Sequence, residues 1–522
     1  MSEHEGRIAR NAGVLVVLTM ASRVAGLVRD FCITHFFGAS GTTDVFYMAF
    51  TIPNVLRRLV AEGTLTAVVQ PVYQSVRQEQ GQEEAKRFYA AVLGCQLVAI
   101  AIITALGILG APLLVTAFAS GFLDEPEKFA LTVTLTRWLF PVIIAMSLVG
   151  MSMAVLNAHD IYGVPALAPI VLNLSMITCT VLGAKFLDHE PIMGVVYGVL
   201  LGGVLQVLVQ VPTLLRLRLL VMPRLRMDPA VKRVLLLMVP GLFNLAVYQL
   251  NIIVLRQLAS YLEEGSVSYY YTADRLMELV VGVFAIAIAQ GAFSTMNSQA
   301  AAGNLEGLKE TWRFSMKLTS LVAVPAALGL GAVAVPIVSV LFLHGRFTWH
   351  DVQQTAWATL AFAPGLVAIS GTRATVQVFS ALEDQRTPLI ASAVVMLSNL
   401  AIGVLLLPFG VAGLAATLTF SSFLQTGLLV LLLRRKIGVL GIGKLLRPAF
   451  WQVLLSAPAV FAAYSLTLLG DWPAGATLKN AAVLFAAIGA AVVIYGGGAV
   501  LLRLEGVDKL AGKLMRRVRR RP

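Results

Sequence analysis

The stretch SRVAGLVRD, residues 22–30, places two arginines and an aspartate inside a long apolar segment. Arg23, Arg29 and Asp30 lie between the apolar runs AGVLVVLTMA and FCITHFFGA. A charged side chain at the centre of a bilayer costs at least roughly 2.5–3.5 kcal/mol, so these residues must face a partner or a wet cavity. The planar guanidinium group of arginine binds phosphate and carboxylate through two parallel hydrogen bonds, which suggests an anion as ligand.

Basic residues recur in two other apolar segments, with acidic or amide side chains nearby. Arg57 lies in TIPNVLRRLVAEG, and Arg275 lies in YYYTADRLMEL. Four arginines facing lipid would cost on the order of 10 kcal/mol. We therefore expect a basic cavity for an anionic, phosphorylated substrate, unless the acids simply neutralise the arginines as packing pairs. The predicted substrate-binding residues are Arg23, Arg29, Arg57 and Arg275, and the predicted supporting residues are Asp30, Asp44, Asn54, Glu62, Asp274 and Glu278.

The elements that position these residues are membrane-spanning helices. Hydrophobic residues make up 58% of the 522-residue chain and charged residues only 13%, against about 25% in soluble proteins. Long apolar runs recur from end to end, and each is long enough for the roughly 20 residues that a spanning helix needs. The chain is therefore an all-α polytopic membrane protein. The fourteen predicted spans are 12–36, 44–74, 85–118, 128–157, 163–186, 191–216, 233–261, 266–299, 313–342, 352–381, 386–407, 411–433, 448–470 and 480–502.

Positive charge fixes the expected orientation. With both termini on one side, the segments on that side hold 27 of the 40 Lys and Arg residues, and the opposite loops hold only Lys128, Lys185, Arg346 and Lys479. This asymmetry is typical of cytoplasmic loops and predicts that both termini are cytoplasmic. The net charge of +13 and the basic tail KLMRRVRRRP are explained by this rule and by nearby acidic lipid headgroups, without nucleic acid as a partner.

Prolines and glycines reveal an internal duplication. Pro112, Pro141 and Pro165 correspond to Pro336, Pro364 and Pro388, at a nearly constant spacing. Each half holds six helices, so the second half enters the membrane from the same side as the first and forms a parallel repeat. The predicted organisation is an N-terminal lobe at 1–220, a C-terminal lobe at 221–440, and two further helices with a basic cytoplasmic tail at 441–522.

Several longer motifs resemble one family of transporters. The segments SRVAGLVRD, TDVFYMAFTIPNVLRRLVAEGTLTAVVQPVY, LAPIVLNLSMI, GGVLQVLVQVP, GSVSYYYTADRLMEL and DQRTP are similar to those of the MurJ/MviN family. Its members are bacterial lipid II flippases of the multidrug/oligosaccharidyl-lipid/polysaccharide exporter superfamily. The resemblance extends over both predicted lobes. The last two helices match the family in position and apolar character more than in their individual residues.

This resemblance implies a V-shaped carrier of the bacterial inner membrane, with two six-helix lobes around a cationic cavity. It implies that the chain moves lipid II, the undecaprenyl-pyrophosphate-linked peptidoglycan precursor, from the inner to the outer leaflet by alternating access. In the family, arginines matching Arg23, Arg29, Arg57 and Arg275 act in the cavity, together with the acid matching Asp44. The last two helices would form a groove for the lipid tail. Membrane lipid and the peptidoglycan-synthesis machinery are the implied partners.

Other functions stay open at this point. A flippase for another polyprenyl-pyrophosphate-linked glycan would need the same basic cavity, whereas a cation-coupled multidrug exporter of the superfamily would place acids at its centre. The sequence shows no metal-ligand cluster, no P-loop and no nucleophile–base constellation, so we expect a transporter rather than an enzyme, without cofactor or metal. The resemblance also brings in a sodium site associated with some members of the family, for which Asp384 and Asn399 are candidate remnants. Alternatively, Asp384 is a helix N-cap beside the turn DQRTP.

Overall fold

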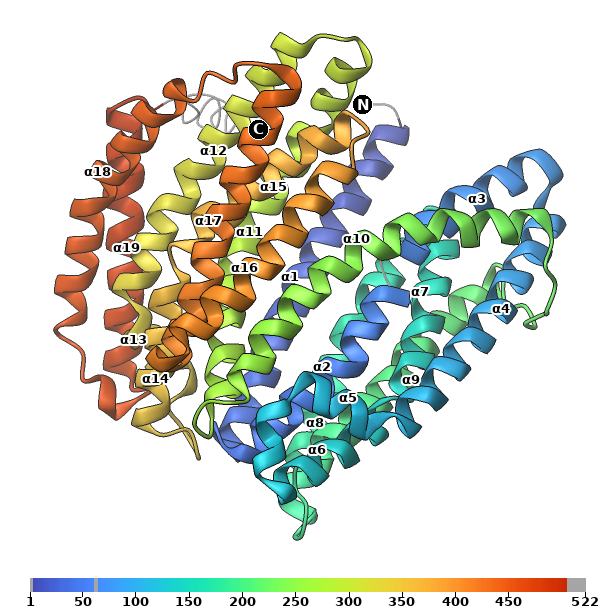
Figure 1. Ribbon diagram of the computed structural model, residues 1–522, viewed down its shortest axis with the longest axis horizontal. Coiled ribbons are helices and arrows are strands. Elements are labelled where there is room, and N and C mark those ends of the chain that lie inside the picture. Colours follow the sequence, from blue (N-terminus) through green and yellow to red (C-terminus); the bar gives the residue numbers. More distant parts are fainter. Residues whose placement is uncertain (1–2, 61–63, 505–522) are drawn as a thin grey trace. The chain divides into compact units, whose positions relative to one another are not determined.

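The computed structural model describes residues 3–60 and 64–504, without the side chains of residues 3–12, 59–60, 64–67, 239–248, 252 and 281–291. Within the described residues all regular structure is helical and no β-strand occurs, which confirms the all-α class. The chain divides into two compact units, Met1–Gly265 and Ser266–Pro522. Figure 1 labels their helices.

The N-terminal unit holds the first ten α-helices and one short 3-10 helix. They are α1 (Glu3–Phe37), α2 (Gly41–Val60), α3 (Thr64–Gln80), α4 (Gln82–Leu109), α5 (Ala111–Phe118), η1 (Ser120–Asp124), α6 (Pro126–Leu139), α7 (Val142–Ala158), α8 (Gly163–Phe186), α9 (Met193–Arg216) and α10 (Pro229–Ala259).

The C-terminal unit holds the remaining described helices. They are α11 (Ser266–Ala301), α12 (Leu305–Ala332), α13 (Ala334–Phe342), α14 (Trp349–Phe362), α15 (Gly365–Ala381), α16 (Arg386–Leu406), η2 (Leu407–Phe409), α17 (Gly410–Ile437), α18 (Gly443–Thr467), η3 (Trp472–Ala474) and α19 (Leu478–Leu501). The helices α18 and α19 pack against each other, and α18 also packs against α12.

The internal repeat recurs in the helix boundaries. The helices α12, α14 and α15 follow α4, α6 and α7 at one constant offset, which is the same for the first and the last residue of each helix. The turns match as well. Gly81 and Gly303 both have positive φ before the equivalent helices α4 and α12, and Asp160 and Glu383, equivalent by the same offset, have φ values of 61° and 57°. Non-glycine residues adopt this left-handed conformation only where the turn requires it, so one turn geometry is used in both repeats.

The boundary between the two compact units differs from the predicted boundary between the two repeats because of one helix. The helix α10 corresponds to α1 in the repeat, but it packs against α2, α3 and α5. Its side chains Val231 and Val234 are buried in a core shared with α3, α4 and α7. Tertiary packing therefore groups α10 with the N-terminal unit, and the repeat boundaries at 220 and 440 stay a prediction from the sequence.

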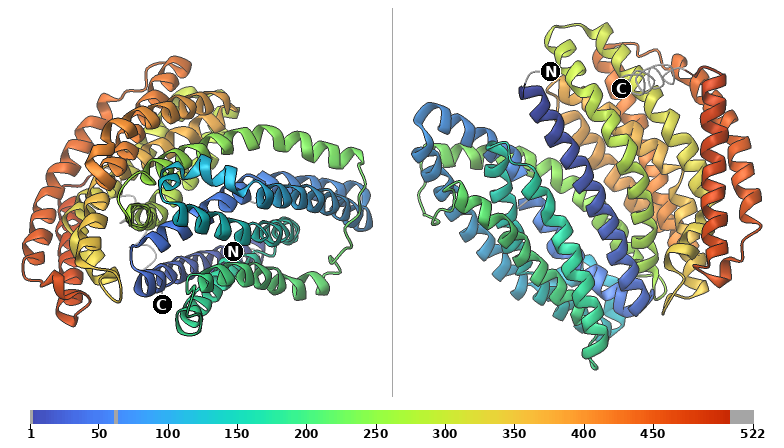
Figure 2. Two further views of the ribbon diagram at one scale, coloured as in Figure 1. Left: turned by 60° about the horizontal axis from the view of Figure 1, so that its bottom comes forward. Right: turned by 180° about the vertical axis from the view of Figure 1, so that it is seen from behind.

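Glycines allow a close contact between α8 and α9, which lie side by side in Figure 2. Gly194, Gly198 and Gly202 recur every four residues and form one face of α9. A Cβ at Gly194 would lie 2.5 Å from the carbonyl oxygen of Cys179 on α8. Small residues at this spacing let the backbones of two helices approach closely. In a membrane such close packing stabilises helix association, because burying apolar side chains away from lipid gains little free energy.

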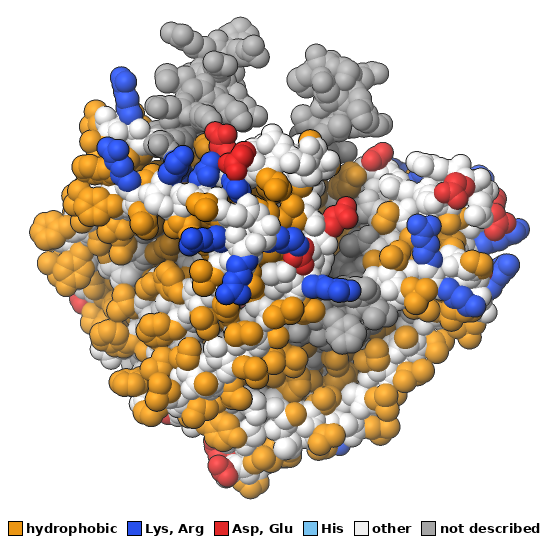
Figure 3. Space-filling model, turned by 45° about the horizontal axis from the view of Figure 1, so that its top comes forward, with side chains coloured by type: hydrophobic (Ala, Val, Ile, Leu, Met, Phe, Trp, Pro, Cys, Tyr) orange, Lys and Arg blue, Asp and Glu red, His pale blue; other side chains and the backbone are white. Residues whose placement is uncertain are grey.

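The surface and the helix lengths identify a membrane protein. Within the described residues, eight helical stretches are long and apolar enough to cross a bilayer, or nine if α14 and α15, bent by 43°, count as one span. One of the eight, Arg386–Ile437, is 52 residues long, and it consists of α16 and α17, which pack against each other. Figure 3 shows hydrophobic side chains over most of one face. The total of fourteen crossings stays a prediction.

Candidate functional site

Arg29 is the buried centre of a polar cluster in the N-terminal unit. Its guanidinium Nη2 lies 2.5 Å from Oδ1 of Asp30, and Nε donates to the same oxygen at 2.9 Å. Its Nη1 donates to Oδ1 of Asn173 at 3.1 Å. Both charged residues are buried, at 7% and 3% exposure for Arg29 and Asp30. The guanidinium is thus held in one orientation by a carboxylate and an amide.

Two helices supply this cluster. Arg29 and Asp30 lie on α1, and Asn173 lies on α8, which packs along α1. The Asn173 amide Nδ2 donates to the backbone carbonyl of Ser22, two turns before Arg29 on α1. Asn173 therefore bridges the backbone of α1 and the side chain of Arg29. Arg23 lies on the same helix and is half-buried.

The second group of predicted residues lies on α2. The Nε of Arg57 donates to Oδ1 of Asn54, one helical turn earlier, at 2.8 Å. Arg57 is half-buried. Pro53 lies inside α2, which continues to Val60. Glu62 lies outside the described residues.

Asp44 is buried at the beginning of α2 and binds backbone. Its Oδ2 accepts a hydrogen bond at 2.8 Å from the N–H of Gly265, in the turn that follows α10. In the same place the carboxylate of Glu264 accepts from the N–H of Gly41. Two carboxylates thus fasten the turn after α10 to the turn between α1 and α2. The structure gives Asp44 a role in holding these two turns together.

The C-terminal unit carries the remaining predicted residues on α11. Nη1 of Arg275 pairs with Oε2 of Glu278 at 3.0 Å, and the two side chains are 33% and 50% exposed. Asp274 is half-buried beside Arg275. The predicted pair Arg275–Glu278 is therefore formed, and it is far more open to solvent than the pair Arg29–Asp30.

Two polar residues were missing from the predicted site. Asn173 was part of the motif LAPIVLNLSMI, and an amide within an apolar helix is a signal of a buried polar contact. Arg256 on α10 donates to the hydroxyl of Thr51 on α2. No sequence pattern connects two positions so far apart along the chain.

The geometry suits binding of an anion. Arginines held by carboxylates can exchange that partner for a phosphate group of matching geometry. Within the described residues, no three His, Cys, Asp or Glu side chains gather as they would around a metal ion.

Comparison with known proteins shows the family to which the chain belongs. Residues 33–482 match the family described as "Lipid II flippase MurJ". The chain belongs to this family. A curated "Lipid II flippase MurJ" of Burkholderia cenocepacia is 35% identical over 424 residues, which cover 80% of this chain and 82% of that protein. A "Probable lipid II flippase MurJ" of Vibrio cholerae is 32% identical over 503 residues, 94% of this chain and 95% of that protein.

Solved structures of this family and of its superfamily share the fold. A "Lipid II flippase MurJ, inward closed conformation" aligns with a TM-score of 0.77 at 22% identity, over 94% of this chain and 98% of that one. An inward-facing multidrug resistance MATE transporter aligns with a TM-score of 0.66 at 16% identity, over 82% of this chain and 98% of that one. Family membership and apolar helices together make the chain a multi-pass inner-membrane protein.

Proposed function

We propose that this protein translocates lipid II from the inner to the outer leaflet of the cytoplasmic membrane by alternating access. Family membership supports the substrate, and the cluster around Arg29 is the observation that supports the mechanism. A buried guanidinium already oriented by a carboxylate and an amide is ready to receive a diphosphate without further ordering. Preorganisation of this kind lowers the entropic cost of binding.

In this mechanism Asp30 holds Arg29 while no substrate is bound. The diphosphate of the lipid then takes over hydrogen bonds from Asp30, because both groups offer oxygens to the same donors. Arg57 and Arg275 are the other proposed ligands of the diphosphate, with Asn54 and Glu278 holding them beforehand. Arg23 and Asp274 are proposed to add charge. Asp44 acts differently, since it fastens two turns. Peptidoglycan-synthesis enzymes are the proposed consumers of the exported lipid.

The membrane arrangement that goes with this proposal has fourteen crossings, two six-helix lobes and cytoplasmic termini. The distribution of Lys and Arg supports this orientation. With the cell interior negative, moving a net anion outward is favoured by roughly 2.3 kcal/mol per charge per 100 mV. The membrane potential can therefore assist transport directly.

Cells depleted of the protein test the proposal. An external enzyme that cleaves lipid II exposed on the outer leaflet reports how much of the lipid has been translocated. We expect exposure to collapse on depletion, to return with the wild type, and to stay low with Arg29→Ala. Unchanged exposure after depletion, in cells without another flippase, would contradict the proposal.

The rival substrate class requires a different control. Proteoliposomes containing another polyprenyl-pyrophosphate-linked glycan show whether the protein selects the peptidoglycan headgroup. Equal transport of both lipids would indicate that the site recognises only the diphosphate and tail. Recovery of the added lipid unchanged after transport distinguishes a flippase from an enzyme that modifies its substrate.

A further inference from the structure

The segment between α9 and α10 concentrates exposed positive charge. Within residues 216–233 the basic side chains outnumber the acidic ones by six to one, and Asp228 is the single acid. Asp228 is already engaged, because its Oδ1 accepts from the N–H of Val231 as the N-cap of α10. All six basic residues are exposed, namely Arg216, Arg218, Arg224, Arg226, Lys232 and Arg233. None of the six forms an ion pair or side-chain hydrogen bond with any part of the chain that the structure describes.

The chain between the two helices is fixed in place although it is not helical. The N–H of Arg224 donates to the carbonyl oxygen of Ala90 on α4 at 2.9 Å. A Cβ at Gly94 would lie 2.3 Å from the carbonyl oxygen of Arg224, so only glycine permits this approach. Leu219 is fully buried in the core of the unit. The backbone and one side of the segment are therefore anchored, and the charged side chains project from a defined support.

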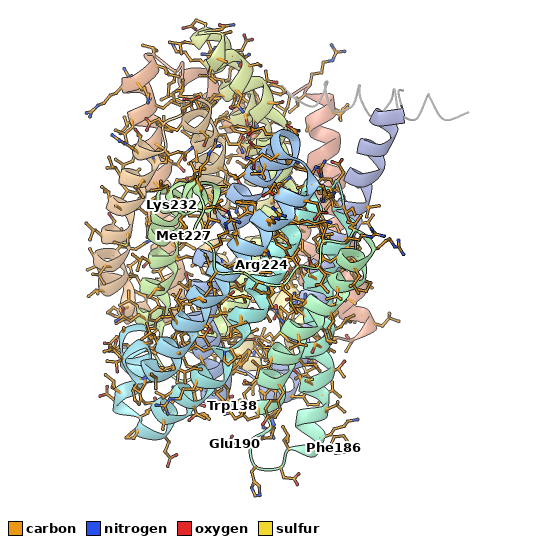
Figure 4. The ribbon with its side chains drawn as sticks, turned by 90° about the vertical axis from the view of Figure 1, so that its right-hand side faces the viewer. Trp138, Phe186, Glu190, Arg224, Met227 and Lys232 are labelled. Atoms are coloured by element: carbon orange, nitrogen blue, oxygen red, sulfur yellow. The ribbon has the colours of Figure 1, made fainter. Side chains whose placement is uncertain are left out.

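Large apolar side chains are exposed between these charges. Met222 is 85% exposed, Leu225 74% and Met227 54%, and Leu236 on the first turns of α10 is 72% exposed. Figure 4 shows Arg224, Met227 and Lys232 along one stretch of the N-terminal unit, away from its other end with Trp138, Phe186 and Glu190. Alternating cations and apolar side chains fit the boundary between headgroups and acyl chains, where one kind meets phosphate and the other meets hydrocarbon.

We propose that residues 216–233, the α9–α10 linker surface, bind anionic phospholipid headgroups of the leaflet on which they lie. The arginine and lysine side chains contact the lipid phosphates, and Met222, Leu225 and Met227 enter the upper acyl region. An acidic protein would match the charge, but it would leave these three apolar side chains without a suitable environment. The surface lies on the cytoplasmic leaflet in the orientation proposed above, and binding itself does not depend on the protein's substrate.

Native mass spectrometry of the full-length protein in detergent tests the surface, with phosphatidylglycerol and phosphatidylcholine as probes. The test variant is Arg224→Gln/Arg226→Gln, which keeps the backbone contact with Ala90. The matched control is Lys86→Gln/Arg87→Gln on α4, which removes equal charge from residues already paired with Glu83 and Glu84. Each basic residue near an anionic surface contributes roughly fivefold in affinity. We expect phosphatidylglycerol binding to weaken on the order of tenfold or more in the test variant and little in the control.

The other outcomes overturn the proposal. Equal weakening in both variants would mean that only net charge matters. Equal retention of both lipids by wild type and variant would mean that the surface does not select anionic headgroups. Displacement of phosphatidylglycerol by millimolar inorganic phosphate would indicate a simple phosphate site. Circular dichroism melting confirms that the variants fold, and lipid II transport is measured separately because the four proposed substrate arginines are unchanged.

Discussion

Arg29 in the N-terminal unit and Arg275 in the C-terminal unit are held in opposite ways. Arg29 is buried and bound by partners on two helices, α1 and α8. Arg275 is one-third exposed and pairs with Glu278 one turn along its own helix. The pair on one helix forms wherever that helix forms, whereas the cluster of Arg29 depends on the packing of α1 against α8. We therefore expect Arg29 to serve both structure and the proposed ligand binding, and Arg275 to serve mainly ligand binding.

The largest expected effect is that of Arg29→Ala. Removing this guanidinium leaves Asp30 buried without its cation, which costs about 3–5 kcal/mol of folding stability. We expect lipid II exposure to fall at least 100-fold and the melting temperature in detergent to fall as well. The control Arg29→Lys keeps a cation beside Asp30 but loses the planar guanidinium group that forms two parallel hydrogen bonds. It should retain most of the stability and little of the transport, and full transport in this variant would contradict bidentate binding.

The variant Arg275→Ala tests the difference between the two arginines. Transport is expected to fall as far as in Arg29→Ala, because the proposed ligand contact is lost. Stability should change by less than about 1 kcal/mol, since solvent-exposed ion pairs contribute little. The measurement pairs the external cleavage assay with thermal unfolding. A large loss of stability with intact transport would show that Arg275 is structural and would reverse the comparison.

Asn173→Ala separates positioning from binding. The change removes the acceptor of Arg29 Nη1 and the donor to the Ser22 carbonyl but leaves the charges in place. Loss of hydrogen bonds to a charged group costs about 1–3 kcal/mol. We expect a several-fold loss of apparent affinity for lipid II with a smaller change in maximal rate. A matched control, Asn399→Ala on α16, removes a buried amide from the equivalent helix of the other unit.

The sequence predicted the helices better than their breaks. It treated 85–118 and 313–342 as single spans, whereas the structure breaks them at Gly110 and Val333. Each break comes shortly before a proline, Pro112 or Pro336, which lacks the N–H that would continue the hydrogen bonding of the preceding helix. The prolines that revealed the repeat therefore also mark interruptions, and hydropathy alone does not show them.

The contacts of the candidate site residues were predictable from the sequence only in part. The pairs Asn54–Arg57 and Glu278–Arg275 follow from helical spacing, and both are formed. The partnership of Arg29 with Asn173 joins distant parts of the sequence and depends on the packing of two helices. The hydrogen bond from the backbone N–H of Gly265 to the Asp44 carboxylate likewise joins distant parts of the sequence. Contacts within one helix follow from spacing, and contacts between helices do not.

Two equivalent turns of the two repeats also hold their polar side chains through different contacts. After α7, His159 contacts the Tyr73 hydroxyl at 3.1 Å and Nη1 of Arg77 at 3.2 Å, both on α3. After α15, Asp384 accepts from the N–H groups of Arg386 and Thr387 and binds Lys436 of α17. Asp384 thus binds the first N–H groups of α16 from the residue before its N-cap, which is Gln385 and not Asp384 as the alternative interpretation had it.

The smallest expected effect is a difference in pH dependence between these turns. Burial and the nearby Arg77 lower the pKa of His159, despite the opposing charge of Asp160. Burial alone would raise the pKa of Asp384, but hydrogen bonds from Lys436 and Thr387 lower it to about 2. The folded protein therefore binds a proton at His159 less readily than the unfolded chain does. The contribution of His159 to stability is present above a pH of about 6.5 and is lost as the pH falls below that value. Asp384 keeps its charge, and its contribution is lost only as the pH falls from about 4 toward 2.

Melting temperatures at pH 7.5 and 5.5 measure this difference. The wild type should lose stability on acidification, and His159→Gln should lose less, because the glutamine does not bind a proton. Asp384→Asn should lower the melting temperature by a similar amount at both values, since the carboxylate stays ionised throughout this range. Equal pH dependence in His159→Gln and the wild type would place the titrating group elsewhere. The two turns would then differ in their contacts but not in their response to protons.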